Sequence, residues 1–477
     1  MTPASRFVPY SYARDNAILL VPKSERDAEV WISDATPLAA LNEVMRVFPG
    51  KVKPIVVEPT RLTEAISQTY GDQSGSAKQI VGDIEGEFDI TRMMQEVPDV
   101  EDLLETEDDA PIIRMINALL TQAARDGASD IHIEPFESYS LVRFRVDGTL
   151  RDVVRPKRAL HAALVSRIKI MAALDIAEKR LPQDGRITLR VGGRPVDVRV
   201  STLPTGHGER AVLRLLEKDL SKLELTNLGM AQGTLDRFDT LIHQPHGIIL
   251  VTGPTGSGKS TTLYAAIRRL DKDTTNIMTV EDPIEYDIEG IGQTQVNAKI
   301  DMSFAKALRA ILRQDPDIVM IGEIRDLETA QIAVQASLTG HLVLATLHTN
   351  DAASAVARLI DMGIEPFLLS SSLLGVLGQR LVRKLCPKCR EQDPATKAWR
   401  AVGCDNCGKT GYVGRTGIYE LLTVDDEMRM LVHQGANDTD IRRVAEKTGM
   451  INMRADARRW VTAGVTSQEE ALRVTRE

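Results

Sequence analysis

Aromatic residues make up only 4% of this 477-residue chain. Surfaces that bind single-stranded nucleic acid stack bases on Phe, Tyr or Trp, so the composition argues against a broad surface of that kind. A basic excess is also absent, because 59 Lys and Arg residues face 67 Asp and Glu residues, for a net charge of −8. We therefore expect no nucleic-acid partner.

Long apolar runs are missing as well. No stretch approaches the roughly 18 uninterrupted apolar residues of a membrane-spanning helix. Near the N-terminus, the apolar run at residues 17–21 is too short for a signal peptide. These absences predict a cytoplasmic protein whose contact with a membrane is peripheral.

The chain length predicts about three domains at roughly 150 residues each. Residues 1–95 mix strand-like and helix-like pieces and are predicted to form a small N-terminal domain without catalytic groups. Residues 96–110 carry eight acidic residues and no basic one, a pattern typical of a solvated linker. Residues 111–225 combine helical periodicity with alternating segments, which predicts an α+β middle domain.

From about residue 226 the pattern changes. Continuous apolar runs, separated by helical stretches, occupy residues 247–252, 276–280, 317–321 and 341–346. Strands buried on both faces of a parallel sheet have this pattern. Residues 226–477 are therefore predicted to form an α/β core.

One loop of this core has the spacing of a phosphate-binding loop. Residues 253–260 match G-x-x-x-x-G-K-[ST], after a predicted strand and before a predicted helix, which indicates a RecA-like P-loop ATPase core. Glycines let backbone N–H groups converge on a phosphate, and the N-terminus of the helix adds positive potential. Lys259 is expected to reach the β and γ phosphates of ATP, and the Ser260 hydroxyl to ligate Mg²⁺. The predicted nucleotide-binding residues are Gly253, Pro254, Thr255, Gly256, Ser257, Gly258, Lys259, Ser260 and Thr261.

Three glutamates follow predicted strands, where open α/β sheets place their ligands. Glu323 comes two residues after an apolar strand, so we assign it to the Mg²⁺ shell, directly or through water. Glu285 is the first choice for the general base and Glu281 the second. Each could instead cap a helix or pair with an arginine. His341 and His348 bracket another strand and are either candidate sensors of the γ-phosphate or ordinary packed histidines.

Arginines can stabilise the charge that develops on a transferred phosphoryl group. The middle domain offers Arg199 and Arg214 on predicted strands. The core offers Arg309 and Arg313, which lie on one helix face, and Arg325, which follows Glu323 by two residues. Each is by default a surface ion-pair partner, and the sequence does not rank them.

All four cysteines lie close together, as Cys386, Cys389, Cys404 and Cys407. Two C-x-x-C pairs can complete a tetrahedron around one ion, which predicts a structural Zn²⁺ site with no open catalytic position. Free thiols are the alternative. Residues 380–415 also carry nine Lys or Arg and three Asp or Glu. This basic excess would suit acidic phospholipid or an acidic protein face, or simply offset the thiolates.

These motifs together give the chain a family resemblance. It closely resembles the type II secretion system ATPase, component E, within the wider secretion and pilus ATPase superfamily, from about residue 101 to the end. The segments that carry the resemblance are ASDIHIEPFE, LDIAEKRLPQDGRI, VTGPTGSGKSTTLYA, TVEDPIEYDIEGIGQTQVN, LRAILRQDPDIVMIGEIRDLETA and SLTGHLVLATLHTNDA. In family terms the last four are the Walker A motif, the Asp box, an atypical Walker B motif and the His box.

The resemblance implies a homohexameric ring on the cytoplasmic face of the inner membrane, with ATP between the middle domain and the core. Arg199 and Arg214 match phosphate-contacting residues of the middle domain, and Glu285 matches the favoured base. The N-terminal domain is expected to dock on the cytoplasmic part of the L component, and the core to act on the inner-membrane F component. ATP hydrolysis would then drive domain motion, pseudopilus assembly and protein export across the outer membrane.

Three other functions stay open at the level of sequence. A type IV pilus assembly ATPase is the rival within the superfamily. A RecA-like nucleic-acid translocase is a rival of a different class, which the charge and the few aromatics disfavour. A nucleotide-gated scaffold with negligible turnover is the third, disfavoured because all the hydrolytic groups are present.

Overall fold

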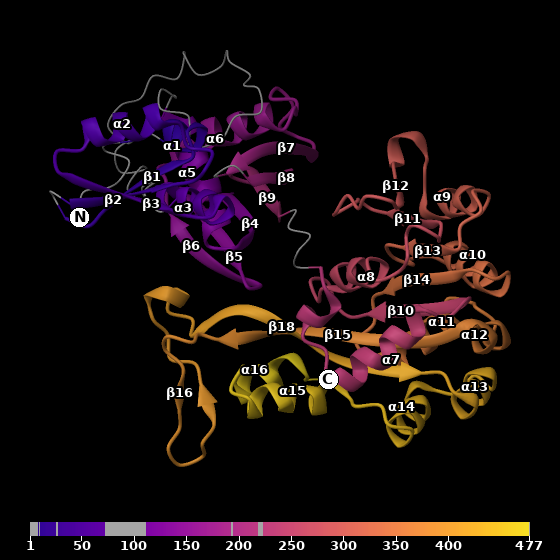
Figure 1. The fold of residues 1–477 in the computed structure, drawn as a ribbon. Coiled ribbons are helices and arrows are strands. Elements are labelled where there is room, and N and C mark those ends of the chain that lie inside the picture. The colour runs from indigo at the N-terminus through magenta and orange to yellow at the C-terminus, as the bar shows by residue number, and fades with distance from the viewer. Residues whose placement is uncertain are drawn as a thin grey trace. The chain divides into compact units, whose positions relative to one another are not determined.

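The computed structural model describes residues 8, 10–24, 27–71, 111–191, 194–217 and 223–476 (Figure 1). They belong to two compact units, which we call the first unit (residues 1–218) and the second unit (residues 219–477). The predicted acidic linker at residues 96–110 lies outside the described residues, as do residues 72–95. Within the described ranges, no helix is long and apolar enough to cross a membrane.

The N-terminal part of the first unit, residues 8–71, is a small α/β fold. Its elements are α1 (Tyr10–Asp15), β1 (Ile18–Pro22), β2 (Asp27–Ile32), α2 (Leu38–Val47), β3 (Lys51–Val56) and α3 (Pro59–Gly71). Strand β2 is central, antiparallel to β1 and parallel to β3. The core forms where Leu20 and Val30 of the sheet meet Val44 of α2 and Leu62 of α3.

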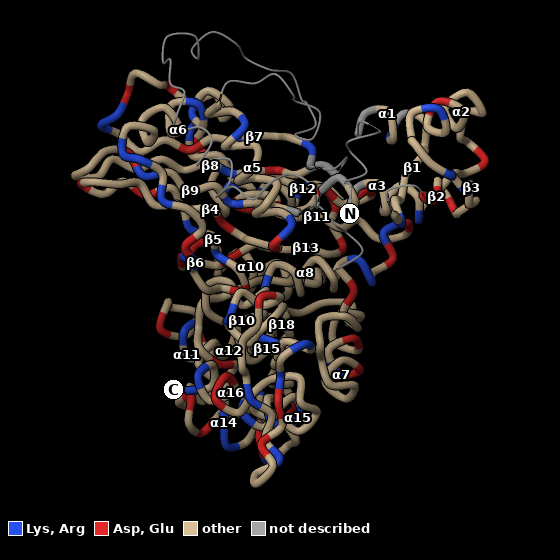
Figure 2. The backbone as a smooth tube through the Cα atoms, turned by 90° about the vertical axis from the view of Figure 1, so that its left-hand side faces the viewer, with Lys and Arg blue, Asp and Glu red and all other residues tan. Residues whose placement is uncertain are grey.

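The rest of the first unit is a six-stranded antiparallel sheet with two helices on one face. Its strands lie in the order β6-β5-β4-β9-β8-β7. In chain order the elements are α5 (Pro111–Arg125), β4 (Ala128–Pro135), β5 (Ser140–Val146), β6 (Thr149–Val154), α6 (Arg158–Met171), β7 (Gln183–Val191), β8 (Arg194–Thr205) and β9 (Gly208–Glu217). Alternating apolar residues such as Ile131, Phe144 and Val198 pack under α5 and α6, which is the pattern of a sheet with one buried face. The charged residues of these strands appear in Figure 2.

The second unit is built on a seven-stranded sheet with the order β12-β11-β13-β14-β10-β15-β18. Its strands are β10 (Gly247–Thr252), β11 (Ile277–Glu281), β12 (Gly292–Gln295), β13 (Ile318–Ile321), β14 (Leu342–Leu347), β15 (Leu373–Leu385) and β18 (Tyr412–Thr423). All neighbours are parallel except the last pair, β15 and β18. The four apolar runs predicted as buried strands are confirmed to within one residue at each end.

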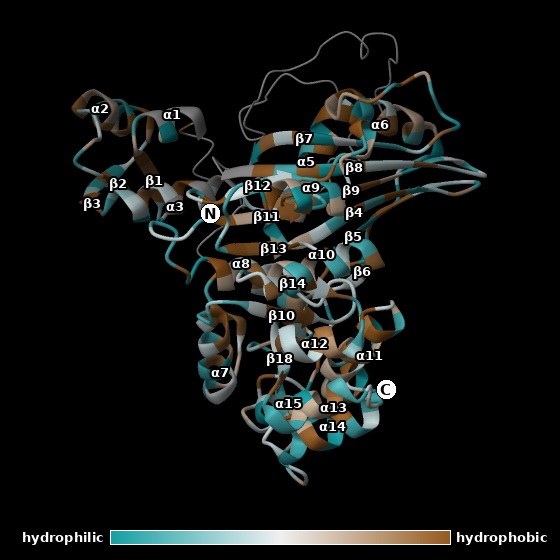
Figure 3. Ribbon diagram, turned by 90° about the vertical axis from the view of Figure 1, so that its right-hand side faces the viewer, coloured by the Kyte–Doolittle hydropathy of each residue, from teal (hydrophilic) through white to brown (hydrophobic). Residues whose placement is uncertain are grey.

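Helices cover both faces of this sheet, so its central strands are apolar on both sides (Figure 3). On one face, α7 (Gln232–Ile242) and α8 (Lys259–Ile267) pack against residues such as Ile249 and Val251. The opposite face, with Ile248 and Leu250, is covered by α9 (Phe304–Ile311), α10 (Leu327–Leu338), α11 (Ala352–Asp361) and α12 (Pro366–Ser372). The α/β class predicted from the runs is therefore correct.

The C-terminal helices are anchored to the sheet by buried carboxylates. These helices are α13 (Asp426–His433), α14 (Asp438–Lys447), α15 (Met453–Thr462) and α16 (Gln468–Val474). Glu470, only 1% exposed, accepts hydrogen bonds from the Arg383 and Arg473 guanidinium groups and from the Arg383 N–H. Burial opposes its ionisation, but these donors outweigh burial and lower the pKa of Glu470 from 4.5 to about 2.

We predict that Glu470→Gln lowers the free energy of unfolding of the second unit by about 3 kcal/mol at pH 7. A carboxyl whose pKa is depressed in the folded state stabilises above its unfolded pKa. That contribution is lost as the pH falls from about 4.5 toward 2, so the difference from wild type shrinks over this range. Urea denaturation at pH 7 and pH 3 measures it, with exposed Glu469→Gln as the matched control. Equal loss in both variants would contradict the assignment.

Candidate functional site

The turn between β10 and α8 has the backbone of a phosphate-binding loop. Gly253, Gly256 and Gly258 have φ angles of 151°, 78° and 88°, which disfavour side chains. A Cβ atom at Gly253 would also clash with the Gln379 carbonyl oxygen of β15. The glycines therefore allow a tight turn that ends where α8 begins, at Lys259.

Lys259 lies inside this turn. Its side chain is buried, with the residue 8% exposed, and Nζ donates to the carbonyl oxygens of Gly253 (2.8 Å) and Pro254 (3.2 Å). Burial lowers the pKa of Lys259, and the nearby Glu323 carboxylate partly opposes that effect. A phosphate oxygen is a stronger acceptor for a cation than a neutral carbonyl, so the buried ammonium is suited to an anionic ligand.

Glu323 and His348 lie beside Lys259 at the carboxyl edge of the sheet. The Glu323 side chain is 13% exposed; Oε1 pairs with Arg325, and Oε2 lies 3.5 Å from His348 Nε2. Burial and the Lys259 cation lower the pKa of His348, while Glu323 raises it. The strands β10, β13 and β14 end at this edge, which brings together residues up to 89 positions apart.

Two threonines fix the strand ends on which these groups depend. Thr252, the last residue of β10, shares a hydroxyl–hydroxyl hydrogen bond of 2.6 Å with Thr349 and accepts from the Thr349 N–H at 3.0 Å. Thr346 Oγ1 donates to the Gly322 carbonyl oxygen at 2.5 Å. The phosphate loop, the segment of Glu323 and the segment of His348 are thereby tied to one another.

The two candidate bases have different surroundings. Glu281 is 4% exposed and accepts from Thr279 Oγ1 (2.5 Å), Gln293 Nε2 (2.9 Å) and the Tyr264 hydroxyl of α8. Glu285 lies in the following loop and is half-buried, and its N–H donates to the Tyr264 hydroxyl at 3.1 Å. A carboxylate with three protein donors is suited to holding structure, whereas the Glu285 position is more accessible.

Three other residues that were predicted to bind nucleotide lie outside the group at the phosphate loop. His341 lies at the amino end of β14, about 20 Å along the strand from the phosphate-loop edge, and its Nδ1 contacts the Ala336 carbonyl oxygen. Arg309 pairs with Glu328 of α10, and Arg313 donates to the Arg309 carbonyl oxygen at 2.8 Å. Neither His341 nor these two arginines join the group formed by Lys259, Glu323, Arg325 and His348.

Arg199 and Arg214 belong to the first unit. They face each other on β8 and β9, on the sheet face opposite α5 and α6. Arg214 Nε donates to Asp130 of β4 at 2.8 Å, and the Arg214 side chain is 60% exposed. The Arg214 guanidinium is thus held to β4 through Nε, while much of its side chain stays exposed.

Sequence reasoning missed several residues that support the site. Gln379 of β15 accepts from Thr262 Oγ1 of α8 at 2.7 Å and lies against the glycine turn. Tyr264 and Gln293 hold the loop that carries Glu285. No motif points to Gln379, and Gln293 lies in the Asp-box segment with no role indicated, because both roles depend on strand neighbours. A lone tyrosine in the helix after a phosphate loop, in a chain poor in aromatics, is a signal that could have been used.

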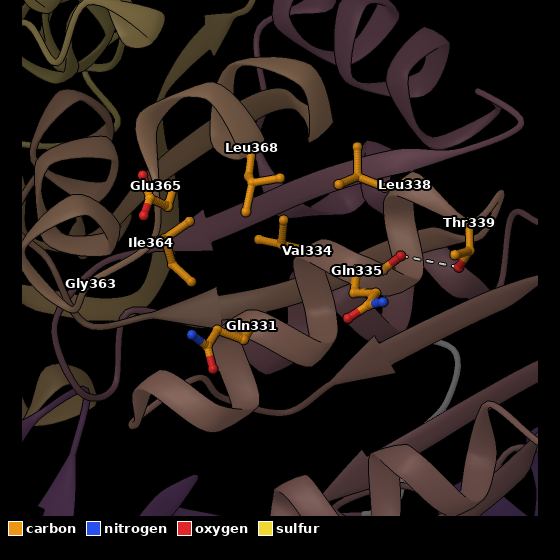
Figure 4. A pocket seen from close by; sticks show the side chains of 9 residues that line it. All are labelled: Gln331, Val334, Gln335, Leu338, Thr339, Gly363, Ile364, Glu365 and Leu368. Atoms are coloured by element: carbon orange, nitrogen blue, oxygen red, sulfur yellow. Dashed lines mark hydrogen bonds between the residues drawn. The ribbon is translucent and has the colours of Figure 1, made fainter.

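A separate pocket of about 430 Å³ lies between α10 and residues 363–368 (Figure 4). Its lining includes Val334, Leu338, Ile364 and Leu368, with Glu365 as its one charged side chain. It holds none of the residues that gather at the phosphate loop. This pocket is therefore separate from the group of residues at the carboxyl edge of the sheet.

The four cysteines form a compact cluster at the tip of the β15–β18 ribbon. The Sγ atoms of Cys386 and Cys404 are 3.9 Å apart, and those of Cys389–Cys407 and Cys404–Cys407 are 3.8 Å apart. Sulfurs at the corners of a zinc tetrahedron are about 3.8 Å apart, given Zn–S bonds of about 2.3 Å. Burial opposes ionisation of Cys407, but N–H donors from Cys404 and Gly411 outweigh it and lower the pKa of Cys407 to about 6. Among the described residues, the donor set and spacing fit a four-thiolate metal site.

Comparison with known proteins relates this geometry to a family. Residues 105–473 match the profile described as type II/IV secretion system protein, and residues 7–70 match the profile of a domain of GSPII protein E. The type II secretion system protein HxcR of Pseudomonas aeruginosa is 64% identical over 98% of this chain and 99% of its own length. The type II secretion system ATPase E of Vibrio cholerae is 54% identical over 99% of this chain and 97% of its own.

Solved structures agree on the fold. The pilus retraction motor PilT with bound ADP has a TM-score of 0.55 at 29% identity, covering 75% of this chain and 96% of PilT. The ATPase DotB of Legionella pneumophila has a TM-score of 0.59 at 22% identity, covering 78% of this chain and 97% of DotB. Profiles, relatives and phosphate-loop geometry therefore converge: the chain belongs to the type II secretion ATPase E family, and it is an ATP hydrolase of that secretion system.

Proposed function

We propose that ATP is hydrolysed at the carboxyl edge of the second unit's sheet, with the phosphates held in the glycine turn by Lys259. The observation that carries the proposal is that the buried Lys259, the Glu323 carboxylate and His348 lie together beside three glycines with positive φ angles. The nucleotide-binding residues proposed are residues 253–261. His348 contacts Glu323 and is the histidine best suited to respond to the γ-phosphate.

Mg²⁺ fits the chemistry of the donors available here. Ser260 is exposed at the start of α8, and Glu323 offers a carboxylate just after β13, which is separated from β10 by β14. Hard oxygen donors of this kind suit Mg²⁺, which is usually held by few protein ligands together with water and phosphate oxygens. Bound there, the ion would neutralise charge on the β and γ phosphates.

Glu285 is proposed as the group that accepts a proton from the attacking water. It is preferred over Glu281 because Glu281 already accepts from three protein donors. Arg325, whose guanidinium pairs with Glu323, is the first choice among the arginines of the second unit for contact with phosphate. Arg199 and Arg214 are proposed as charge-stabilising groups from the first unit, with Arg309 and Arg313 as further candidates.

Zn²⁺ is proposed as the ion held by Cys386, Cys389, Cys404 and Cys407. Four thiolates leave no open position, so the metal would be structural and would fix the tip of the β15–β18 ribbon. The N–H groups that contact Cys407 support its thiolate character, whereas burial and the neighbouring cysteines raise the pKa of Cys389 in the absence of a metal ion. Zn²⁺ would therefore be a second metal ion of the protein, with a structural role that differs from the role of Mg²⁺ beside ATP.

At the level of assembly we propose a homohexamer attached peripherally to the cytoplasmic face of the inner membrane. The match of residues 7–70 to a domain of GSPII protein E supports docking of this domain on the cytoplasmic part of the L component. The core would act on the F component, so that hydrolysis drives pseudopilus assembly. The basic ribbon tip at residues 380–415 would suit acidic phospholipid.

We predict that Lys259→Ala weakens ATP binding by at least about tenfold, because it removes the buried cation from the glycine turn. Titration of the full chain with a fluorescent ATP analogue measures the dissociation constant. Lys272→Ala is the matched control, since Lys272 is exposed and its Nζ donates to the Glu289 carbonyl oxygen, away from the glycine turn. Unchanged binding in Lys259→Ala would place the nucleotide elsewhere.

Glu285→Gln is expected to lower kcat by about 100-fold or more while the affinity for ATP stays within about threefold, as removal of a general base does. Single-turnover hydrolysis and equilibrium binding separate the two quantities. Glu289→Gln, exposed in the same loop, should keep the wild-type rate. If Glu281→Gln loses turnover and Glu285→Gln does not, the base has been misassigned.

The zinc site predicts about one Zn²⁺ per chain by elemental analysis of protein purified under reducing conditions. Cys404→Ser should lose the metal and lower the melting temperature, because three thiolates hold the ion less firmly. Asp405→Asn is the control: its side chain lies between two cysteines in sequence but is 96% exposed. Metal-free wild-type protein would refute the site.

A further inference from the structure

Tyr264 connects the helix of the phosphate loop with the loop of the candidate base. It lies in the second turn of α8 and is 1% exposed. Its hydroxyl donates to Glu281 and accepts from the N–H groups of Glu285 (3.1 Å) and Tyr286 (3.4 Å). Its ring packs edge-on against Tyr286, with ring centroids 5.2 Å apart. One side chain therefore contacts the end of β11 and the backbone on which the base is carried.

The acceptor of this hydroxyl is itself held in place. Glu281 accepts from Thr279 and from Gln293 of β12, and Gln293 also donates to the Tyr286 carbonyl oxygen at 2.9 Å. Burial and the Glu281 carboxylate raise the pKa of Tyr264, so its hydroxyl stays protonated and keeps donating. A buried tyrosine needs only one partner to be satisfied. The additional contacts of Tyr264 go to the backbone of the Glu285 loop.

The geometry has a consequence for hydrolysis. Lys259 begins α8 and Tyr264 lies five residues later, about 7 Å along the same helix. A general base must sit within hydrogen-bond reach of the attacking water, and misplacement of about 1 Å can cost a large factor in rate. The Tyr264 hydroxyl fixes the backbone of Glu285 relative to the helix that begins at the phosphate lysine.

We propose that Tyr264 is a positioning residue for ATP hydrolysis, which sets the place of Glu285 relative to the phosphate loop through its hydroxyl. This inference rests on the proposed function, because it gives Tyr264 a role only if Glu285 acts as the base. In this proposal the hydroxyl makes no contact with ATP, and nucleotide binding is assigned to residues 253–261.

Tyr264→Phe in the full chain tests the proposal, because it removes the hydroxyl and keeps the ring against Tyr286. The expected result is a fall in kcat of about tenfold with KM and the affinity for an ATP analogue unchanged. Tyr412→Phe is the matched control: it removes a buried hydroxyl that pairs with Ser467 at 2.7 Å, remote in sequence from the Glu285 loop. A Tyr264→Phe rate no lower than that of Tyr412→Phe would overturn the proposal.

A double mutant separates positioning from general destabilisation. If Tyr264 acts through Glu285, adding Tyr264→Phe to Glu285→Gln should cost no further rate, because the positioned group is already gone. A further loss of about tenfold in the double mutant would overturn the proposal. Failure of Glu285→Gln alone to reduce kcat would instead refute the base assignment, and the two failures are thus distinguishable.

Gln293→Leu provides a second variant if Tyr264→Phe does not fold. Gln293 holds the same loop through its hydrogen bonds to Glu281 and to the Tyr286 carbonyl oxygen. It should also lower kcat several-fold at unchanged KM. Wild-type turnover in a folded Gln293→Leu protein would show that the loop needs no such support, which also overturns the proposal.

Discussion

A lysine ammonium buried in a turn of glycine backbone is the interaction on which the second unit is organised. Its cation lies where burial disfavours charge, so the turn must offer oxygen acceptors and the site must suit an anion. Because β15 passes directly against this turn with Gln379, Gly253 and Gly258 have no room for a Cβ atom. The sheet order, with β10 between β14 and β15, therefore shapes the turn.

Parallel topology explains how distant segments reach this lysine. Strands β10, β11, β13 and β14 run in one direction, so the residues that follow them gather at one edge. Two carboxylates there have divided roles: Glu281 is occupied by protein donors, whereas Glu323 contacts a histidine and an arginine. The Tyr264 hydroxyl then connects the binding element with the element that carries Glu285. In the proposed mechanism, one helix would therefore join nucleotide binding to hydrolysis.

In the C-terminal part of the second unit, strands β15 and β18 continue past the end of β10 as a two-stranded ribbon. The antiparallel ribbon of β15 and β18 carries the cysteine cluster at its tip, and Glu470 and Asp456 hold the last helices against it. The cysteine cluster and the two buried carboxylates are both suited to stabilising the fold, because each consists of groups that would be costly to bury without a partner. Strand β15 of this ribbon also carries Gln379 against the glycine turn, so the ribbon and the phosphate edge share one strand.

The sequence alone determined the α/β class, the central strands, the phosphate loop and the cysteine set, because each depends on local pattern or fixed spacing. Buried parallel strands need continuous apolar runs, and a phosphate turn needs glycines at set positions. Only tertiary structure decided that His348 and not His341 lies near Lys259, since the two bracket one strand and strand direction sets which end faces the loop. It also decided that Glu281 is held by Tyr264 and Gln293, because those partners come from a helix and a neighbouring strand that no spacing in the chain reveals.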